Sequence, residues 1–352
     1  MSDLLSPELS AARAAFAAFL DNAPREGRTV ALHDSDADGV AAGVVWELGL
    51  KRLGYADLAR VIPDRERNAW TEANRARVQA ARPEALFVLD LGSQTESVIP
   101  GVPTCFVDHH RPEGAPHGDT LISAYTWDPI PNTSLLLWEL LRPLANVEDL
   151  DWIAAIGTLS DLGDQAPFAL IEEAKKKYKA KYLREATTLI NASRRASHYH
   201  PETAARALLA HSDPRALTEA TSGDVEELRA ARAEVKAAME DAKKVAPVFS
   251  GQVAWLRLNS PCQIHPLIAQ IWRTRLPKYI VLAANEGYLP GRVNFSVRSA
   301  SGINVLEFLR GIELDLPEGE GNYGHGHDQA SGGSLPIVHW RRFLEKLGFT
   351  IS

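Results

Sequence analysis

The sequence predicts an α/β protein with a doubly wound, mostly parallel sheet in its N-terminal domain and a smaller α/β domain after a helical linker. Short apolar or β-prone runs at residues 29–32, 86–89 and 105–107 are typical of buried parallel strands. Helical patterns at 40–53 and 71–81 lie between these runs. The alternation predicts βαβ units, in which polar residues just past the strand ends line the ligand crevice.

Helical patterns continue beyond the first sheet, and a new α/β pattern begins near Val248. The apolar run 135–141 follows Asn132, Thr133 and Ser134, which is typical of a capped helix start, and residues 152–159 predict another helix. A breaker-poor run rich in Ala, Glu, Lys and Arg, at 222–244, predicts a long linking helix. Beyond it, strand-like and helical runs alternate at 253–258, 266–276, 279–283, 293–297 and 304–309. We therefore predict an N-terminal domain at 1–195, a helical linker at 196–245 and a smaller C-terminal domain at 246–352.

Composition limits the class of protein. The 352 residues are 45% hydrophobic, which is enough for two domains with their own cores. The N-terminus lacks a secretory pattern, and no run approaches the roughly 20 apolar residues of a membrane span, so a cytoplasmic address without a membrane partner is expected. Cys105 and Cys262 lie far apart, which argues against a disulfide framework and against a thiolate zinc site.

Charge is unevenly divided along the chain. The net charge is -7, yet residues 246–352 hold ten Lys or Arg and eight Asp or Glu, a surplus of +2 that leaves -9 for the rest. A protein that grips a long DNA or RNA track usually has a much larger basic surplus. If this region binds a polyanion, a short substrate is therefore expected rather than a long one. The sequence does not fix the oligomeric state, and a homodimer is compatible with it.

Three carboxylates, at Asp34, Asp36 and Asp38, directly follow the first predicted strand. Side chains at this spacing can converge on a small volume, where their mutual repulsion favours a divalent cation. A solvated acidic turn or a calcium loop is the alternative interpretation, although an EF-hand would need a longer ligand run that ends in Glu.

Three further motifs carry acids or imidazoles at strand or helix ends. Asp90 ends the second apolar run, and Asp108, His109 and His110 follow the third. Histidine nitrogen suits manganese, iron or zinc, and a neighbouring carboxylate can orient an imidazole. Asp161 lies near the end of an apolar helical segment. Each motif alone could be a helix cap or a surface turn, and only their joint occurrence in a βαβ frame indicates a site.

The succession DSDADG, VLDLG, VDHH and GTLSDLGD resembles the four motifs of the DHH phosphoesterase superfamily and spans nearly all of the first half. The segment GHGHDQASG at 324–332 resembles the signature of the associated C-terminal domain, although His325 interrupts the usual triple glycine. The resemblance implies a phosphodiesterase that uses two divalent metal ions, usually manganese, to activate a water. Its fold would be the two-domain α/β fold predicted above.

Roles for individual residues follow from this resemblance. One ion would be held by Asp34, Asp36 and Asp90, and the other by Asp38, Asp90, His109 and Asp161. Asp108 would orient its neighbours, and His110 would lie close to the substrate phosphate. Many members begin the first motif with a metal-binding His, whereas RecJ-type exonucleases begin it with Asp, so both His33 and Asp34 are candidates, with Asp34 favoured.

The resemblance implies that the C-terminal domain binds the substrate. Glycines such as Gly326 allow backbone N–H groups to approach an anion, and His327 can add a donor. Arg298, which ends a predicted strand, resembles the basic residue that family members place beside this loop, and Arg292 is a weaker candidate. A flexible glycine-rich turn and a solvated arginine are the alternative interpretations.

Several functions are compatible with these motifs. The expected activity is hydrolysis of short oligonucleotides, of the nanoRNase type, with short single-stranded RNA or DNA or dinucleotides as partners. A RecJ-like single-stranded DNA exonuclease and a cyclic-dinucleotide phosphodiesterase would use the same residues, but only about twenty residues follow the glycine segment, too few for the extra OB-type domain that RecJ-type enzymes commonly carry. Family II pyrophosphatases lack the glycine-histidine segment. A non-catalytic nucleic-acid-binding protein would be expected to have lost motif acids that are all present here.

Overall fold

The computed structural model describes residues 7–317 and 322–350, apart from the side chains of Asn322 and residues 325–327. By its internal contacts the chain forms two compact units. Unit 1 comprises Met1–Arg194 and Tyr199–Arg229, and unit 2 comprises Arg195–His198 and Ala230–Ser352. The domain boundaries derived from the sequence, at 195 and 245, stay a prediction.

The sheet of unit 1 has five strands that are all parallel, in the order β2-β1-β3-β4-β5. The strands are β1 (Thr29–His33), β2 (Leu58–Val61), β3 (Ala85–Leu89), β4 (Thr104–Asp108) and β5 (Thr120–Ser123). The predicted doubly wound parallel sheet is confirmed. The sequence missed the edge strands β2 and β5, because edge strands are short and partly exposed and lack a continuous apolar run.

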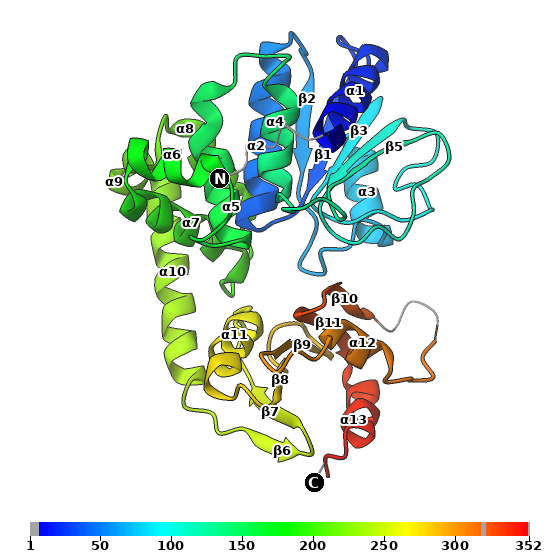
Figure 1. The fold of residues 1–352 in the computed structure, drawn as a ribbon, viewed down its shortest axis with the longest axis vertical. Helices are drawn as coiled ribbons and strands as arrows, with labels where there is room; N and C mark the ends of the chain where they lie inside the picture. The colour runs from blue at the N-terminus through cyan, green and yellow to red at the C-terminus, as the bar shows by residue number, and fades with distance from the viewer. Residues whose placement is uncertain (1–6, 318–321, 351–352) are drawn as a thin grey trace. The chain divides into compact units, whose positions relative to one another are not determined.

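Helices cover both faces of this sheet (Figure 1). Alternate strand residues point to opposite faces, so Phe87 packs into one core with Trp46 of α2, whereas Leu86 packs into another with Val78 of α3. The helices of this part of the chain are α1 (Pro7–Asn22), α2 (Ala37–Arg52), α3 (Glu72–Ala80), α4 (Thr133–Leu141), α5 (Asp151–Asp161), α6 (Ala169–Tyr178), α7 (Ala180–Arg195), α8 (Pro201–Ala210), α9 (Pro214–Glu219) and α10 (Gly223–Ala242), with a 3₁₀ turn at Glu148–Leu150.

The strand order fixes where a ligand site can form. From β1 the chain moves to β2 on one side and then to β3 on the other. In open parallel sheets, ligands bind at the carboxyl ends of the strands where the order reverses in this way. Asp34 directly follows β1, and Asp90 directly follows β3. The topology therefore brings two of the motifs side by side.

Unit 2 has a mixed six-stranded sheet in the order β10-β11-β9-β8-β7-β6, in which only β7 and β8 pair in parallel. Its core gathers around Phe295, Trp340 and Phe343. The elements are β6 (Val248–Ser250), β7 (Val253–Leu258), α11 (His265–Arg275), β8 (Ile280–Asn285), β9 (Arg292–Ser299), α12 (Val305–Arg310), β10 (Asn322–His327), β11 (Ala330–Pro336) and α13 (Ile337–Lys346). The predicted second α/β domain is confirmed.

The glycine-histidine segment is a β-hairpin and not the loop that the sequence suggested. Strand β11 pairs with β9 so that Ala330 lies opposite Arg298 and Gly332 opposite Ser296. A Cβ atom on Gly332 would lie 2.3 Å from the carbonyl oxygen of Phe295. The glycines therefore permit close strand pairing here, a use of glycine that composition does not distinguish from a flexible turn.

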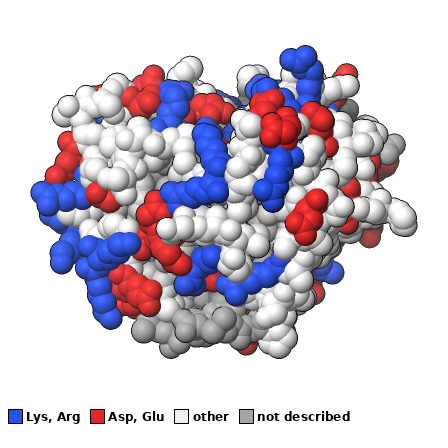
Figure 2. All heavy atoms as spheres, turned by 90° about the horizontal axis from the view of Figure 1, so that it is seen from above, with Lys and Arg blue, Asp and Glu red and all other residues white. Residues whose placement is uncertain are grey.

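Helix hydropathy and surface charge bear on what the protein can bind. In residues 7–317 and 322–350, no helix combines the length and the apolar content that crossing a membrane requires. On the face shown in Figure 2, Lys and Arg are interspersed with Asp and Glu, as in a surface without a one-sign track. A long polyanion gains little from such mixed charge.

Gly157 gives a test of the packing of α5 against its neighbours. Gly to Ala within a helix usually stabilises by about 1 kcal/mol, but a Cβ at Gly157 would lie 2.1 Å from Ser134 Oγ and 2.8 Å from Asp38 Oδ1. We expect Gly157→Ala to lower the free energy of unfolding of unit 1 by about 1–3 kcal/mol, as overpacking does. Denaturant unfolding followed by circular dichroism measures it. Gly223→Ala, with no atom within 4 Å of the added Cβ, is the matched control and should not destabilise.

Candidate active site

Side chains from all four N-terminal motifs meet at the carboxyl edge of the parallel sheet. Their potential ligand atoms form three groups, each with its atoms within 4.8 Å of one another. The groups are Asp34, Asp36 and Asp90; Asp38, His109 and Asp161; and Asp90, His109 and His110. The structure thus brings together all six side chains that the sequence assigned to metal binding, and Asp90 is shared between groups.

The first motif is positioned by the tight passage from β1 into α2. Asp36 is the N-cap of α2, and its carboxylate accepts hydrogen bonds from the backbone N–H groups of Asp38 and Gly39, both at 3.1 Å. A Cβ on Gly39 would lie 2.5 Å from the Asp34 Cβ. The DxDxDG pattern therefore needs its glycine so that the helix can start directly over the end of β1.

Asp38 lies in the first turn of α2, and its carboxylate lies at the N-terminus of α4. It accepts hydrogen bonds from the backbone N–H groups of Thr133 at 2.9 Å and Ser134 at 2.8 Å, and from the Asn132 side chain. The positive end of a helix dipole favours a carboxylate in this position. Even so, complete burial and the neighbouring Asp161 raise the pKa of Asp38 to about 7.

Asp90 adopts a left-handed backbone conformation, with φ of 65°. Such a conformation costs energy in a residue with a side chain and is common where function requires an exact side-chain direction. The Asp90 carboxylate accepts a hydrogen bond from Thr133 Oγ1 at 2.9 Å and lies 3.3 Å from His109 Nε2. Burial, followed by repulsion from Asp38, raises the pKa of Asp90 well above its ordinary value. Thr133 was predicted only as part of a helix start, so its contact with the site was missed.

The two histidines of the third motif have different surroundings. His109 is buried, and its Nε2 lies 3.3 Å from both Asp90 Oδ1 and Asp161 Oδ2. Burial alone would lower the pKa of His109, but these two carboxylates outweigh it and raise that pKa well above its usual value. His110 has a side chain that is 35% exposed, so it is the imidazole that a bound molecule can reach.

Asp108 connects the third motif to the loop after β3. Its carboxylate accepts hydrogen bonds from the backbone N–H of Gly92 at 2.7 Å and of His110 at 2.5 Å, and it contacts His110 Nδ1 at 3.0 Å. Burial alone would raise the pKa of Asp108, but the charge and hydrogen bonds of His110 and the Gly92 N–H hold it well below its usual range. Asp108 stays ionised and fixes the orientation of the His110 ring.

The geometry favours Asp34 over His33 as a ligand. His33 is completely buried, and its ring lies against α2, where a Cβ on Gly43 would lie 2.3 Å from its Cδ2. Its Nδ1 lies 2.8 Å from the carbonyl oxygen of Asp34, the geometry of an N–H donating to that oxygen. Burial, followed by the charge of Arg60, lowers the pKa of His33 to about 3. Asp34, in contrast, lies among the carboxylates of the site.

Two arginines that the sequence did not single out contact this carboxylate cluster. Arg67, in the segment between β2 and α3, donates to both oxygens of Asp34 and lies 3.3 Å from Asp36 Oδ2. Arg194, near the end of α7, lies 3.4 Å from the same oxygen of Asp36. Both are far from the cluster in sequence and belong to no motif, so no pattern in the chain indicated them.

Unit 2 contains a second set of polar groups, around Arg298. Its Nη1 donates to the carbonyl oxygens of Val297 at 2.9 Å and Ser331 at 3.2 Å. Burial, followed by the charge of Arg273 on α11, lowers the pKa of Arg298 to about 10. Two mutually repelling cations favour an anion between or beside them. The sequence missed Arg273, because an arginine in the last turn of a helix is usually only solvated.

The contacts of the other residues of unit 2 that were predicted to bind substrate give less support for that role. The Arg292 guanidinium donates to Ser334 Oγ at 2.8 Å and to its carbonyl oxygen at 3.0 Å, so the neighbouring strand already holds it. Gly326 and His327 lie in the backbone of β10, but the His327 side chain lies outside the described part of the structure.

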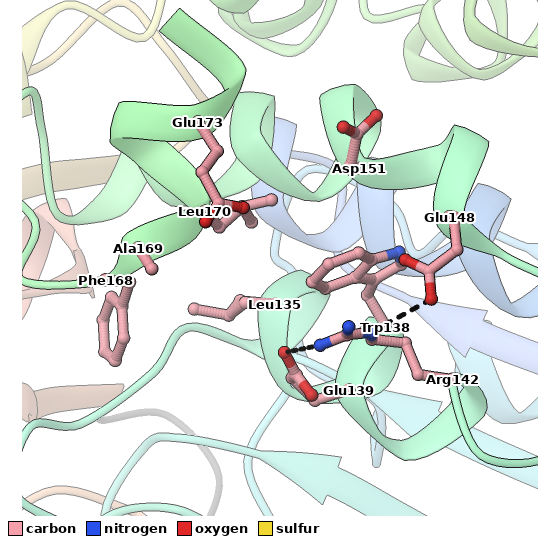
Figure 3. A pocket seen from close by; sticks show the side chains of 10 residues that line it. All are labelled: Leu135, Trp138, Glu139, Arg142, Glu148, Asp151, Phe168, Ala169, Leu170 and Glu173. Atoms are coloured by element: carbon pink, nitrogen blue, oxygen red, sulfur yellow. Dashed lines mark hydrogen bonds and ion pairs between the residues drawn. The ribbon is translucent and has the colours of Figure 1, made fainter. Parts of the chain in front are cut away.

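A cavity of about 190 Å³ lies elsewhere in unit 1, among α4, α5 and α6 (Figure 3). The Arg142 side chain stacks over the Trp138 ring and pairs with Glu139 at 3.0 Å and with Glu148 at 3.5 Å. Lys177 neutralises Asp151, which also lines the cavity. Ion pairs thus compensate the charges of Glu139, Glu148 and Asp151, and none of the motif residues lines the cavity.

The donor set of the motif cluster fits divalent cations. It offers carboxylate oxygens from Asp34, Asp36, Asp38, Asp90 and Asp161 together with an imidazole nitrogen from His109. Oxygen donors with one or two imidazoles suit manganese, and buried carboxylates this close need positive charge to offset their repulsion. Burial, followed by that repulsion, raises the pKa values of Asp38 and Asp90.

This arrangement predicts that stabilisation of the protein by Mn²⁺ increases with pH. The pKa of Asp38 is raised in the folded state, so its contribution to stability is present at low pH and is lost as pH rises through about 7. Ligation needs the ionised carboxylate and a neutral His109, so ions bind better as protons leave. We expect the Tm with Mn²⁺ minus the Tm with EDTA to grow by several degrees between about pH 5.5 and about pH 7.5.

Differential scanning calorimetry in the two buffers measures this difference. Asp38→Asn, which removes the titrating carboxylate, is the control and should flatten the pH profile. A stabilisation by Mn²⁺ that is independent of pH in the wild-type protein would contradict the assignment of Asp38 and His109 as ligands.

No protein-family model and no curated protein matches the sequence. The chain does match solved structures. One is a RecJ exonuclease bound to manganese, with 22% sequence identity and a TM-score of 0.65, and the match covers 96% of this chain and 93% of that chain. RecJ with Mn²⁺ from Thermus thermophilus matches at 22% identity and TM-score 0.67, over 98% of this chain but only 55% of that chain. The DHH domain of a member of a family of ribosomal proteins matches at 18% identity and TM-score 0.69, over 97% and 90%. The chain therefore shares the fold of these RecJ and DHH-domain structures.

Proposed function

We propose that this chain is a two-metal-dependent phosphodiesterase that hydrolyses short oligonucleotides with a metal-activated water. The observation that carries the proposal is the cluster of six ligand side chains in which Asp90 is shared between groups. When bound, two divalent ions would lower the pKa of a water toward neutrality and offset the negative charge that develops on the phosphoryl oxygens. Manganese is the ion that this mixture of carboxylate and imidazole donors favours.

The chain's own residues would position these ions and the substrate. Asp34, Asp36 and Asp90 would hold one ion, and Asp38, Asp90, His109 and Asp161 the other. Thr133 and the N-terminus of α4 fix the directions of the Asp90 and Asp38 carboxylates. Both metal sites would therefore be preorganised by hydrogen bonds from the same helix start.

His110 is the group proposed to contact the substrate phosphate. Burial alone would lower the pKa of His110, but the charge and hydrogen bond of Asp108 outweigh burial and raise that pKa, which favours the imidazolium form. Such a cation can donate a hydrogen bond to a phosphate oxygen and hold it while water attacks. Asp108 acts through His110 and is a positioning residue.

The proposal assigns substrate binding in unit 2 to Arg298, with Arg273 next to it and the backbone of Gly326 and His327 in the paired hairpin. The cation pair supports binding of a phosphate group there, and the small basic surplus of residues 246–352 supports a short substrate. We propose that one or a few nucleotides are held at a time.

A RecJ-like exonuclease acting on single-stranded DNA is the second candidate. It is favoured by the likeness to RecJ over 96% of this chain and by the Asp that begins the first motif. Cleavage of a cyclic dinucleotide would use the same cluster, so substrate comparison has to separate these activities.

A substrate panel tests the proposed activity. We expect hydrolysis of dinucleotides and short oligomers in the presence of Mn²⁺, at a rate that falls with strand length and vanishes with excess EDTA. Single-stranded DNA, RNA, cyclic dinucleotides and pyrophosphate complete the panel. Asp90→Asn, which keeps the size of the shared ligand but removes its charge, should reduce kcat by about 10³-fold or more while the protein stays folded.

Two results would contradict this assignment. Full activity in excess EDTA would exclude the metal-activated water. Faster cleavage of long single strands than of dinucleotides would favour the RecJ-like alternative.

Arg298 gives a separate test of the role of unit 2. Removal of a charge-assisted hydrogen bond to phosphate costs about 1.5–3 kcal/mol, so we expect Arg298→Ala to lower kcat/KM for a dinucleotide by about tenfold or more. Mn²⁺ binding, measured by calorimetry, should not change. Arg292→Ala is the matched control, because both Nε and Nη2 of Arg292 bond Ser334, whereas the two bonds of Arg298 to carbonyl oxygens use Nη1; it should alter kcat/KM less than about twofold. Equal effects of both substitutions would remove the special role of Arg298.

A further inference from the structure

Arg67 occupies an unusual place beside the carboxylate cluster. It lies between β2 and α3, and its backbone is left-handed, with φ of 56°. The buried side chain of Asn74 fixes the surrounding segment: its Oδ1 accepts from the Asp64 N–H at 2.9 Å, and its Nδ2 donates to the Asn68 carbonyl oxygen at 2.7 Å. The segment thus holds Arg67 with its guanidinium directed at the cluster.

The contacts of Arg67 cover atoms that an ion would need. Nε donates to Asp34 Oδ1 at 2.7 Å, and Nη2 donates to Asp34 Oδ2, so both carboxylate oxygens of Asp34 are engaged. Nη2 also lies 3.3 Å from Asp36 Oδ2. A bidentate guanidinium satisfies a carboxylate in a fixed plane. A divalent ion bound to the same oxygens would repel the guanidinium and compete for the same lone pairs.

The other half of the cluster is different. Asp38 is held by neutral donors, namely backbone N–H groups and the Asn132 amide. Asp161 lies 3.3 Å from His109 Nε2, and that imidazole belongs to the same group of potential ligands. A guanidinium stays charged at all working pH values, so it can only move away. An ion that enters the Asp34–Asp36 half must therefore displace a guanidinium. An ion that enters the other half meets neutral donors and an imidazole.

Resting on the proposed two-metal site, we infer that Arg67 is a built-in cation for the Asp34–Asp36 half of the cluster and is displaced when a divalent ion binds there. The two ions then bind in order: the first, tighter ion enters at Asp38, His109 and Asp161, and the second, weaker ion replaces Arg67. Arg194, 3.4 Å from Asp36 Oδ2, stays in place, and its Nε and Nη1 are buried without a hydrogen-bond partner among the described residues.

The replacement of Arg67 by an ion also changes how the site can bind a substrate. Arg67 leaves the carboxylates only when the second ion binds in its place, and its guanidinium is then free to bind an anion beside that ion. Phosphate is the anion that such a fork and a divalent ion bind together. The side chain, 31% exposed, can reach a bound molecule. A nucleotide phosphate would therefore bind Arg67 only in the protein that already holds both ions.

Titration of Mn²⁺ into metal-free protein, followed by isothermal calorimetry, tests the exchange without any substrate. We expect two steps of unequal affinity in the wild-type protein. Arg67→Gln should tighten the weaker step by about tenfold and leave the tighter step within about twofold. Arg206→Gln is the matched control, because Arg206 also pairs bidentately with an aspartate, Asp224, but on the surface, and both steps should keep their wild-type affinities.

A second measurement uses the wild-type protein, so it does not depend on the folding of a variant. In ¹⁵N-labelled protein titrated with diamagnetic Mg²⁺, the Arg67 Nε–H resonance should shift with the second equivalent and not with the first. Arg67→Lys identifies that resonance by its loss. An unchanged or weaker second step in Arg67→Gln, or an Nε–H signal that never moves, would overturn the inference and make Arg67–Asp34 a permanent ion pair.

These outcomes are separable from failure of the proposed activity. Two ordered binding steps with displacement of Arg67, in a protein that hydrolyses none of the panel substrates, would support the exchange and remove the proposed function. If no Mn²⁺ binds, the exchange and the two-metal proposal fail together.

Discussion

Electrostatic repulsion among buried carboxylates is the constraint on which the rest of this site depends. Asp34, Asp36, Asp38 and Asp90 are each no more than 8% exposed, and they lie at one edge of one sheet. Such a group is stable only where positive charge or proton uptake offsets it. The chain supplies positive charge in three forms: the N-terminus of α4, the imidazole of His109 and two guanidinium groups.

The parallel sheet makes this concentration of charge feasible. Reversal of the strand order at β1 and β3 leaves a crevice at their carboxyl ends, and the strands themselves are fully buried and rigid. Glycines at positions 39 and 157 let helices α2 and α5 approach the carboxylates more closely than any larger residue would allow. Packing and electrostatics are therefore coupled, since the same close contacts that bury the acids also bring them their donors.

Much of the site could be predicted because its residues are local to strand ends. The DxDxDG pattern after 29–32, the acid after 86–89 and the DHH tripeptide after 105–107 all lie where a parallel sheet places its functional side chains. Continuous apolar runs predicted the central strands for the same reason. The edge strands β2 and β5 and the hairpin of β10 and β11 escaped prediction, because partial exposure and glycine content hide strand periodicity.

The sequence by itself determined the α/β class, the order of the motifs and the acids and histidines of the cluster, because these depend on local patterns and on residue chemistry. Only the tertiary structure decided that His33 faces α2 while Asp34 faces the cluster, and that Arg67 and Arg194 contact it. It alone also placed Thr133 against Asp90, from the start of a helix more than forty residues further along the chain. Contacts between residues far apart in sequence leave no periodic signal, so they become visible only when the chain is folded.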